Sequence, residues 1–333
     1  MASLDPGVSF RMTTKGGEFY ESSLEGTPGH QKAQTEKMEV VIGSGKKGQS
    51  YLYWRGDELF ELPVSYWTSL DRWVNSPGYV DGTADFGRAI TPRCMECHAS
   101  FIQELSGGSK TGFHYSKTSL ATGISCERCH GAGAEHVRSQ SAGAGTVTSS
   151  AGLSGGAGGT PITAAGGKMP PLGFERDRQV EICAQCHGGI GKNLSPAFSF
   201  KPGEALAPHI SLELNPLARV DVHGNQVALL EKSRCFQSSG SMTCSTCHNL
   251  HEPERTAASY SDKCLTCHQA SACPTFSKMP TPAVTNCVDC HMPLQESNSL
   301  RVDLDNQQVP IKVRSHWIRV YPSQAPAHQN SDR

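Results

Sequence analysis

Cys244-Ser245-Thr246-Cys247-His248-Asn249-Leu250-His251 is the stretch around which the rest of this chain is organised. Cys244, Cys247 and His248 form a C-x-x-C-H pattern, which is typical of covalent haem attachment. The two thiols add across the haem vinyl groups, and the histidine offers its imidazole to the iron. His251 follows too closely in sequence to reach the far face of the same haem. We therefore expect His251 to ligate the iron of a neighbouring haem.

The same pattern occurs six times in 333 residues and uses twelve of the fourteen cysteines. The six motifs, numbered along the chain, are Cys94, Cys97 and His98; Cys126, Cys129 and His130; Cys183, Cys186 and His187; Cys244, Cys247 and His248; Cys264, Cys267 and His268; and Cys287, Cys290 and His291. The sequence thus predicts six haem c groups, each with its motif histidine as the proximal ligand of the iron.

Other cysteine chemistries explain the pattern less well. Structural zinc uses paired C-x-x-C knuckles, but it does not require a histidine directly after every second cysteine. A disulfide framework does not need two-residue spacings repeated so regularly. Iron–sulfur clusters of the bacterial type need a C-x-x-C-x-x-C run, which the sequence lacks.

Composition agrees with a chain that buries prosthetic groups. The formal net charge is -1, so nothing suggests a nucleic-acid partner. Hydrophobic residues make up 37% of the sequence, which is low for a globular domain. Buried porphyrins, which are large apolar plates, would supply the missing core.

Covalent haem attachment takes place outside the cytoplasm, so we expect an exported protein, periplasmic or extracellular. Residues 1–30 show no basic segment followed by an apolar one, which indicates that an export signal has been removed. No stretch is apolar for long enough to predict a transmembrane span.

The chain divides at about residue 90. Residues 1–90 carry no haem motif, and the aromatic-rich segments 51–54 and 58–62 around Gly56 predict a β-hairpin. Residues 91–333 would form the hexahaem domain, with a Gly- and Ser-rich flexible insertion at 141–171. We expect a mainly α fold with much irregular coil, organised around the haems, beside a small β-containing N-terminal region.

Two helices follow from local signals. Residues 179–187 place Val180, Cys183 and His187 on one helical face, and Gly188-Gly189 suits a C-terminal cap. Residues 226–235 predict a second helix.

Tyr66, Trp67 and Trp73 pack either against the first haem or within the protein core, and the sequence leaves both readings open.

The number of histidines indicates whether each haem iron can have a second, distal histidine ligand. Fourteen histidines minus six in the motifs leaves eight. Those we expect as distal ligands are His114, His136, His209, His223, His251 and His316, whereas His30 and His328 lie near the termini. Bis-histidine ligation closes both axial positions, so such an iron transfers electrons and binds no substrate. Met292 and the other methionines are then packing residues and not ligands.

Cys235 and Cys273 remain outside the motifs. In an exported protein two unassigned cysteines most economically form a disulfide. Free thiols or a thiolate ligand to iron are the alternatives.

These features resemble the multihaem cytochromes of the cytochrome c-554 family, over about residues 38–320. The resemblance is carried by Ile124-Ser125-Cys126-Glu127-Arg128-Cys129-His130-Gly131 with His136, by Met242-Thr243-Cys244-Ser245-Thr246-Cys247-His248 with His251, and by Cys287-Val288-Asp289-Cys290-His291-Met292-Pro293. It implies a helical and irregular fold with haems in stacked and perpendicular pairs. Relatives often have an extra cysteine pair where Cys235 and Cys273 lie. Many also carry a further haem motif near the N-terminus, where this sequence has no cysteine.

The first functional hypothesis is therefore a six-haem electron relay between redox partner proteins, without catalysis. The second is self-assembly of such a relay into a conductive extracellular filament. The third is an oxidoreductase acting on a small nitrogen or sulfur species, which needs one haem without a distal ligand. Some nitrite reductases carry lysine in place of the motif histidine, and certain sulfite reductases have a long cysteine spacing. None of the six motifs shows either feature.

Overall fold

The computed structural model describes the chain except for several segments. The described residues are 7–27, 29–79, 84–105, 112–134, 137–138, 173–189, 191–212, 225–252, 256–273, 286–304 and 307–321. The predicted insertion at 141–171 lies outside them. No described helix is long and apolar enough to cross a membrane.

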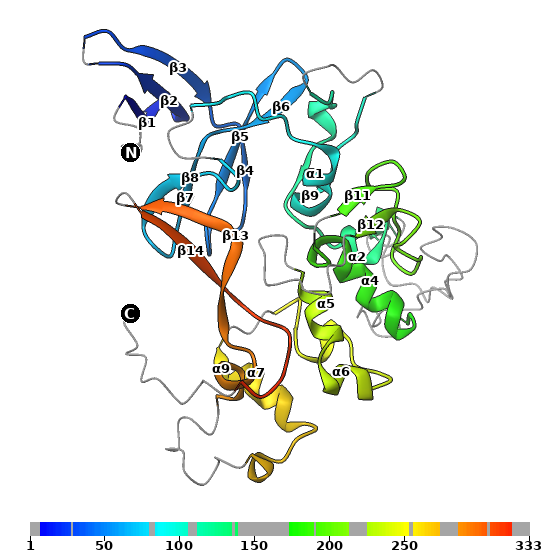
Figure 1. Cartoon of the computed structure of the whole chain (residues 1–333). Coiled ribbons are helices and arrows are strands. Elements are labelled where there is room, and N and C mark those ends of the chain that lie inside the picture. Colours follow the sequence, from blue (N-terminus) through cyan, green and yellow to red (C-terminus); the bar gives the residue numbers. More distant parts are fainter. Residues whose placement is uncertain are drawn as a thin grey trace.

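The described part of the chain contains more strands than helices (Figure 1). The α-helices are α1 (Pro92–His98), α2 (Glu127–His130), α4 (Arg176–His187), α5 (Gln226–Glu231), α6 (Arg234–Ser238), α7 (Ala257–Leu265) and α9 (Cys287–His291). The 3₁₀-helices are η1 (Lys117–Ser119), η2 (Cys244–Thr246) and η3 (Ala270–Ala272). The strands are β1 (Val8–Lys15), β2 (Glu18–Glu25), β3 (Lys32–Lys37), β4 (Val40–Ile42), β5 (Ser50–Arg55), β6 (Glu58–Glu61), β7 (Val64–Trp67), β8 (Arg72–Asn75), β9 (Ala99–Phe101), β10 (Ala121–Thr122), β11 (Gly191–Asn193), β12 (Ile210–Leu212), β13 (Leu294–Leu304) and β14 (Gln307–Arg314).

The prediction of a mainly α fold is therefore wrong. The described strands form six small antiparallel sheets, and β1 to β8 make the N-terminal region rich in β-structure. Strands β1 and β2 are joined at Gly16-Gly17, where both residues have positive φ, a conformation that glycine adopts without strain. β2 is largely polar and lacks apolar alternation, whereas β1 alternates Val8, Phe10 and Met12 with polar residues, a strand signal that the prediction of a mainly α fold did not use.

The predicted hairpin is confirmed, and it explains how the N-terminal sheets hold the first motif. β5 and β6 pair antiparallel, with Arg55 opposite Glu58 across a turn that contains Gly56. Because strand side chains alternate between faces, Tyr53 and Phe60 pack into one apolar cluster, with Leu62 and Phe86. Leu52 and Leu59 belong to another cluster, which includes Met95 of α1, Ala99 of β9, Ile102 and Tyr115.

The N-terminal aromatics pack within the protein. The Trp73 ring lies 5.7 Å from that of Tyr51 and 5.2 Å from that of Tyr66, and both tyrosines belong to the cluster around β5 and β6 or pack against it. This arrangement favours the core-packing interpretation of Tyr66 and Trp73.

A second part of the fold is built on α4. The predicted helix at 179–187 is confirmed and begins earlier, at Arg176. Its cap is also confirmed, because the Gly188 N–H donates to the Ala184 carbonyl and Gly189 has positive φ. Val180 and Ala184 pack in one cluster with Val227 and Leu230 of α5, with Phe200, and with Ile210 of β12.

The predicted helix at 226–235 is only partly correct. The chain forms α5 and then α6, with a break at Lys232-Ser233. Ser233 is fully buried, and its hydroxyl donates to the His316 carbonyl and accepts from the Ile318 N–H. The break thus provides a side chain that holds the C-terminal segment in place.

The C-terminal hairpin of β13 and β14 was not expected from the sequence. It returns to the N-terminal region, where β13 contacts β8 (Figure 1). In β14 the apolar residues Val309, Ile311 and Val313 alternate with polar residues and Pro310, whereas β13 is largely polar. The alternation in β14 was a local strand signal that could have predicted this hairpin.

We predict that Leu62→Ala destabilises the protein strongly. Leu62 is 0% exposed, and shortening such a side chain typically lowers the free energy of unfolding by about 2–5 kcal/mol. Chemical denaturation followed by circular dichroism measures the change. Val41→Ala is the control, because Val41 is 47% exposed and should change stability by less than about 0.5 kcal/mol. Equal effects of the two substitutions would contradict this description of the core.

Candidate haem-attachment site

Each C-x-x-C-H motif lies on a single helical turn. In motifs two, four and five, the histidine N–H donates to the carbonyl of the first cysteine over 2.9, 3.0 and 2.9 Å. Motifs one, three and six lie within or at the end of α1, α4 and α9. Residues three and four positions apart lie on one helix face. The motif spacing therefore presents two thiols and one imidazole on the same side of each turn.

Local capping residues begin several of these turns directly before the motif. Thr91 caps α1 by accepting from the Cys94 N–H, and Pro92 follows it. Thr243 and Thr246 form a capping box around η2. Asn286 caps α9 by accepting from the Asp289 N–H. These caps stabilise helices that are too short to be stable on their own.

Motif three contacts both motif one and motif four. The Cys97 thiol donates to the Gln185 carbonyl over 3.6 Å, and the Cys186 thiol donates to the Glu96 carbonyl over 3.8 Å. The Cys97 and Cys186 thiols also interact, and this contact is the main reason why the pKa of Cys97 falls to about 7. At the other end of the motif, the Cys183 thiol interacts with that of Cys244. Three attachment turns from distant parts of the sequence therefore lie side by side.

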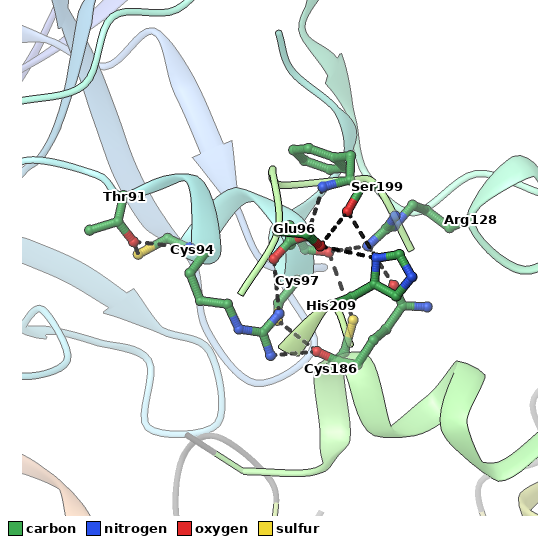
Figure 2. A network of polar contacts seen from close by, with 12 residues as sticks. Thr91, Cys94, Glu96, Cys97, Arg128, Cys186, Ser199 and His209 are labelled. Carbon is green, nitrogen blue, oxygen red and sulfur yellow. Dashed lines mark hydrogen bonds and ion pairs between the residues drawn. The ribbon is translucent and has the colours of Figure 1, made fainter. Parts of the chain in front are cut away.

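Motif two joins the same group through Arg128. Figure 2 shows this polar network, in which Arg128 lies beside Glu96. The Arg128 Nη2 atom donates to the Glu96 carbonyl over 2.8 Å and to the Gln185 Oε1 atom over 2.6 Å. Glu96 and Gln185 directly precede Cys97 and Cys186. We call the contact region of motifs one, two and three, made by Arg93, Glu96, Cys97, Arg128, Gln185 and Cys186, the junction.

Two of the predicted distal histidines lie against motif histidines. The rings of His130 and His251 have centroids 5.9 Å apart and planes inclined by 17°. For His248 and His316 the values are 6.0 Å and 23°. Two imidazoles that bind one metal ion at about 2 Å each would have ring centroids about 6 Å apart. Both pairs therefore have the separation of two axial ligands of one iron.

These imidazoles are electrically suited to metal binding. Burial lowers the pKa of His316 to about 4, and burial also lowers the pKa values of His130 and His248. They are neutral at pH 7, and neutral imidazole is the form that binds metals. The Nδ1 atoms of His130 and His316 are buried without a hydrogen-bond partner among the described residues. Such atoms cost free energy unless another group satisfies them.

Of the other predicted distal histidines, the described ones, His114 and His209, contact residues other than a motif histidine. His114 Nδ1 lies 2.8 Å from Asp57 Oδ1, and His209 contacts Ser195, Ser199 and Glu204. His136 and His223 lie outside the described residues, as does His328. The roles of these residues as iron ligands stay predictions.

The predicted proximal histidine of motif six shows how the backbone can orient a ligand. His291 Nδ1 lies 3.0 Å from the Arg319 carbonyl oxygen. A proton on Nδ1 is thereby bound, and Nε2 is left as the atom with a lone pair. Metal-binding histidines commonly use their second nitrogen in this way.

The predicted disulfide is not formed in the structure. None of the fourteen cysteines makes a disulfide. Cys235 interacts with Cys247 and Cys264, whereas Cys273 interacts with Cys290. Cys235 therefore lies near motifs four and five, and Cys273 lies near motif six.

The donor set fits haem c. Every motif supplies two thiols and an imidazole on one turn, and two motifs have a second imidazole at axial separation. Zinc held by cysteines and histidines would need four ligands around one ion. Within the described residues no three His, Cys, Asp or Glu side chains gather to hold a metal ion directly.

Sequence reasoning missed the junction residues Arg93, Glu96, Arg128 and Gln185. Arg128 stands inside motif two, as the residue before its second cysteine. A charged residue within an attachment turn was the available signal, but its partners are 32 and 57 positions away.

Comparisons with known proteins agree with this site. The family described as "Cytochrome c554 and c-prime" matches residues 75–131, which contain motifs one and two. The "C-type polyheme cytochrome OmcC" of Geobacter sulfurreducens is 25% identical over 201 residues, which is 58% of this chain. The chain spans 22% of that relative's length. No solved structure matches. Together these matches support a c-type cytochrome with several haems.

Proposed function

We propose that this chain is an electron relay that holds six haem c groups, each attached at one of the six motifs. The paired imidazoles carry this proposal, because their spacing of about 6 Å suits two ligands on one iron. His130 with His251, and His248 with His316, would then close two irons to other ligands. When bound, the haem supplies one-electron transfer at its iron.

The side chains of the chain set the conditions for that transfer. Neutral imidazoles on both sides of an iron hold its coordination constant in both oxidation states. Motif three lies next to motif one, where Cys186 approaches Cys97, and next to motif four, where Cys183 approaches Cys244. Motifs five and six adjoin through the contact of α7 with α9. We infer a continuous path from motif one through three and four to five and six, with motif two attached at the junction.

The proposal includes the setting of the protein. Haem is attached covalently outside the cytoplasm, so we infer export to the periplasm or the cell exterior. Electron donors and acceptors would be redox partner proteins. Polymerisation into a filament is a prediction that electron microscopy of the native material tests.

The ferric spectrum of the purified protein tests the relay. Absorption and electron paramagnetic resonance spectra are recorded with and without cyanide or nitrite. We expect low-spin iron throughout, with no change when either ligand is added, because both axial positions are filled. A high-spin iron that binds the added ligand would instead favour an oxidoreductase.

A further inference from the structure

The cation of Arg128 is held at the junction by neutral acceptors. Its Nη2 atom donates to the Glu96 carbonyl and to the Gln185 side-chain amide. The Phe198 ring lies 5.1 Å from the guanidinium carbon. The Arg128 Nε atom is buried and has no hydrogen-bond partner among the described residues. This guanidinium is therefore fixed in place but not neutralised by these contacts.

The nearby carboxylates are engaged elsewhere. Glu96 is 3% exposed, accepts from the Phe198 N–H over 2.7 Å and pairs with Arg93 over 3.3 Å. Arg93 also donates to the Gln185 carbonyl over 2.6 Å. Glu127 accepts from the Gly133 N–H over 2.7 Å. The junction thus combines two guanidinium groups with one buried carboxylate, which leaves one positive charge in excess.

We propose that Arg128 is a positioning and redox-tuning residue, whose fixed charge raises the reduction potentials of the haems attached at motifs one and three. This proposal rests on the proposed haem attachment. A positive charge stabilises the reduced iron, which carries one positive charge fewer than the oxidised iron. The interaction is stronger in a partly buried site than in water, because the effective dielectric constant is lower. Electrons would therefore be held more strongly at the junction than they would be without this charge.

The contacts of Arg128 explain why this charge acts on two haems. Its two acceptors belong to residues 96 and 185, each next to a haem-attaching cysteine, Cys97 and Cys186. These cysteines interact with each other, so the attachment edges of both haems would adjoin the same guanidinium. Arg128 itself lies on the turn of motif two. Its contacts therefore hold that turn against the turns of motifs one and three.

Three variants test the charge, and one controls for it. Arg128→Gln removes the cation, and Arg128→Lys keeps a charge without the planar fork. Gln185→Glu keeps the shape of the acceptor but places a carboxylate where Gln185 Oε1 now lies 2.6 Å from Arg128. Arg178→Gln is the control. Arg178 lies on α4, as Gln185 does, but its guanidinium is paired with Glu181. Spectroelectrochemical titration of the holoprotein measures the potentials.

In the titration curve, two of the six haems should contribute a component with a changed midpoint. We expect Arg128→Gln and Gln185→Glu to lower the reduction potential of that component. The expected change is about tenfold in the reduction equilibrium, or about 59 mV for one electron. Arg128→Lys should stay nearer to the wild type, and Arg178→Gln should superimpose on it. The proposal is overturned if Gln185→Glu leaves the titration unchanged, or if Arg178→Gln shifts it equally.

Haem content separates this proposal from the proposed function. Peptide mapping of the wild type shows whether motifs one and three carry haem, and the ferric spectrum shows whether their irons are low-spin. If all six haems are present and low-spin but the potentials do not respond to Gln185→Glu, the relay stands and the role of Arg128 fails. If motifs one and three lack haem, the proposed attachment fails first, and the tuning role falls with it.

Discussion

Replacing His316 with alanine is expected to convert one haem in six from low-spin to high-spin iron. The His316 ring lies 6.0 Å from that of His248, and its backbone is fixed by Ser233. Without the imidazole, the iron attached at motif four would lose one axial ligand and bind water or cyanide. Electron paramagnetic resonance of the ferric protein, with and without cyanide, measures this change.

Two comparisons make the His316 result specific. Added imidazole should restore the low-spin signal in His316→Ala, because it replaces the missing ligand without repairing the chain. His30→Ala is the matched control, since His30 is exposed and lies apart from the motifs in sequence. A fully low-spin spectrum in His316→Ala that cyanide does not alter would show that His316 is not an axial ligand.

The second large effect concerns the pH dependence of stability in the N-terminal region. Glu21 is 0% exposed, and its Oε1 atom accepts from the Val64 N–H over 3.1 Å. Burial raises the pKa of Glu21 to about 8, although that hydrogen bond opposes the rise. Glu61, whose pKa burial raises to about 7, adds a further increase to that of Glu21. The folded state therefore holds a proton on Glu21 that the unfolded chain releases at lower pH.

The sign of the pH effect follows from that difference. Between the unfolded pKa of 4.5 and the folded value of about 8, the folded state binds more protons, so stability falls as pH rises. Glu21→Gln removes the titration and keeps an oxygen for the Val64 N–H. We expect the variant to match the wild type near pH 4 and to exceed it by roughly 3–5 kcal/mol above pH 9, the free-energy equivalent of the pKa shift.

Denaturant unfolding at several pH values, followed by circular dichroism, measures this effect. Glu18→Gln on the same strand is the control, because Glu18 is exposed and pairs with Lys37, which lowers its pKa. Glu18→Gln should lose stability with rising pH as the wild type does. If Glu21→Gln and the wild type lose stability in parallel from pH 5 to pH 9, Glu21 is not protonated in the folded protein.

The sequence was most informative where chemistry depends on local spacing. The positions of Cys244, Cys247 and His248 within one turn follow from their separation of three and four residues. The β5–β6 hairpin and α4 could also be predicted, because aromatic strands around Gly56 and the cap at Gly188-Gly189 are local signals. Each of these features is contained in fewer than fifteen consecutive residues.

The sequence was least informative where distant segments meet. The pairing of His248 with His316 joins one residue before the β13–β14 hairpin in the sequence to one residue after it. The Arg128 contacts with Glu96 and Gln185 likewise depend on how α1, α2 and α4 pack. The prediction of a mainly α fold was wrong because short helical motifs were extrapolated to the rest of the chain, and the alternation of apolar residues in β1 and β14 was not used.

The haem content of the purified protein tests the central claim most directly. Mass spectrometry under denaturing conditions retains covalently attached haem and removes any haem that is merely bound. The account predicts the polypeptide mass plus six haems, with peptide mapping that assigns one haem to each C-x-x-C-H motif. A mass with no covalent haem, or with haem at only some motifs, would contradict it.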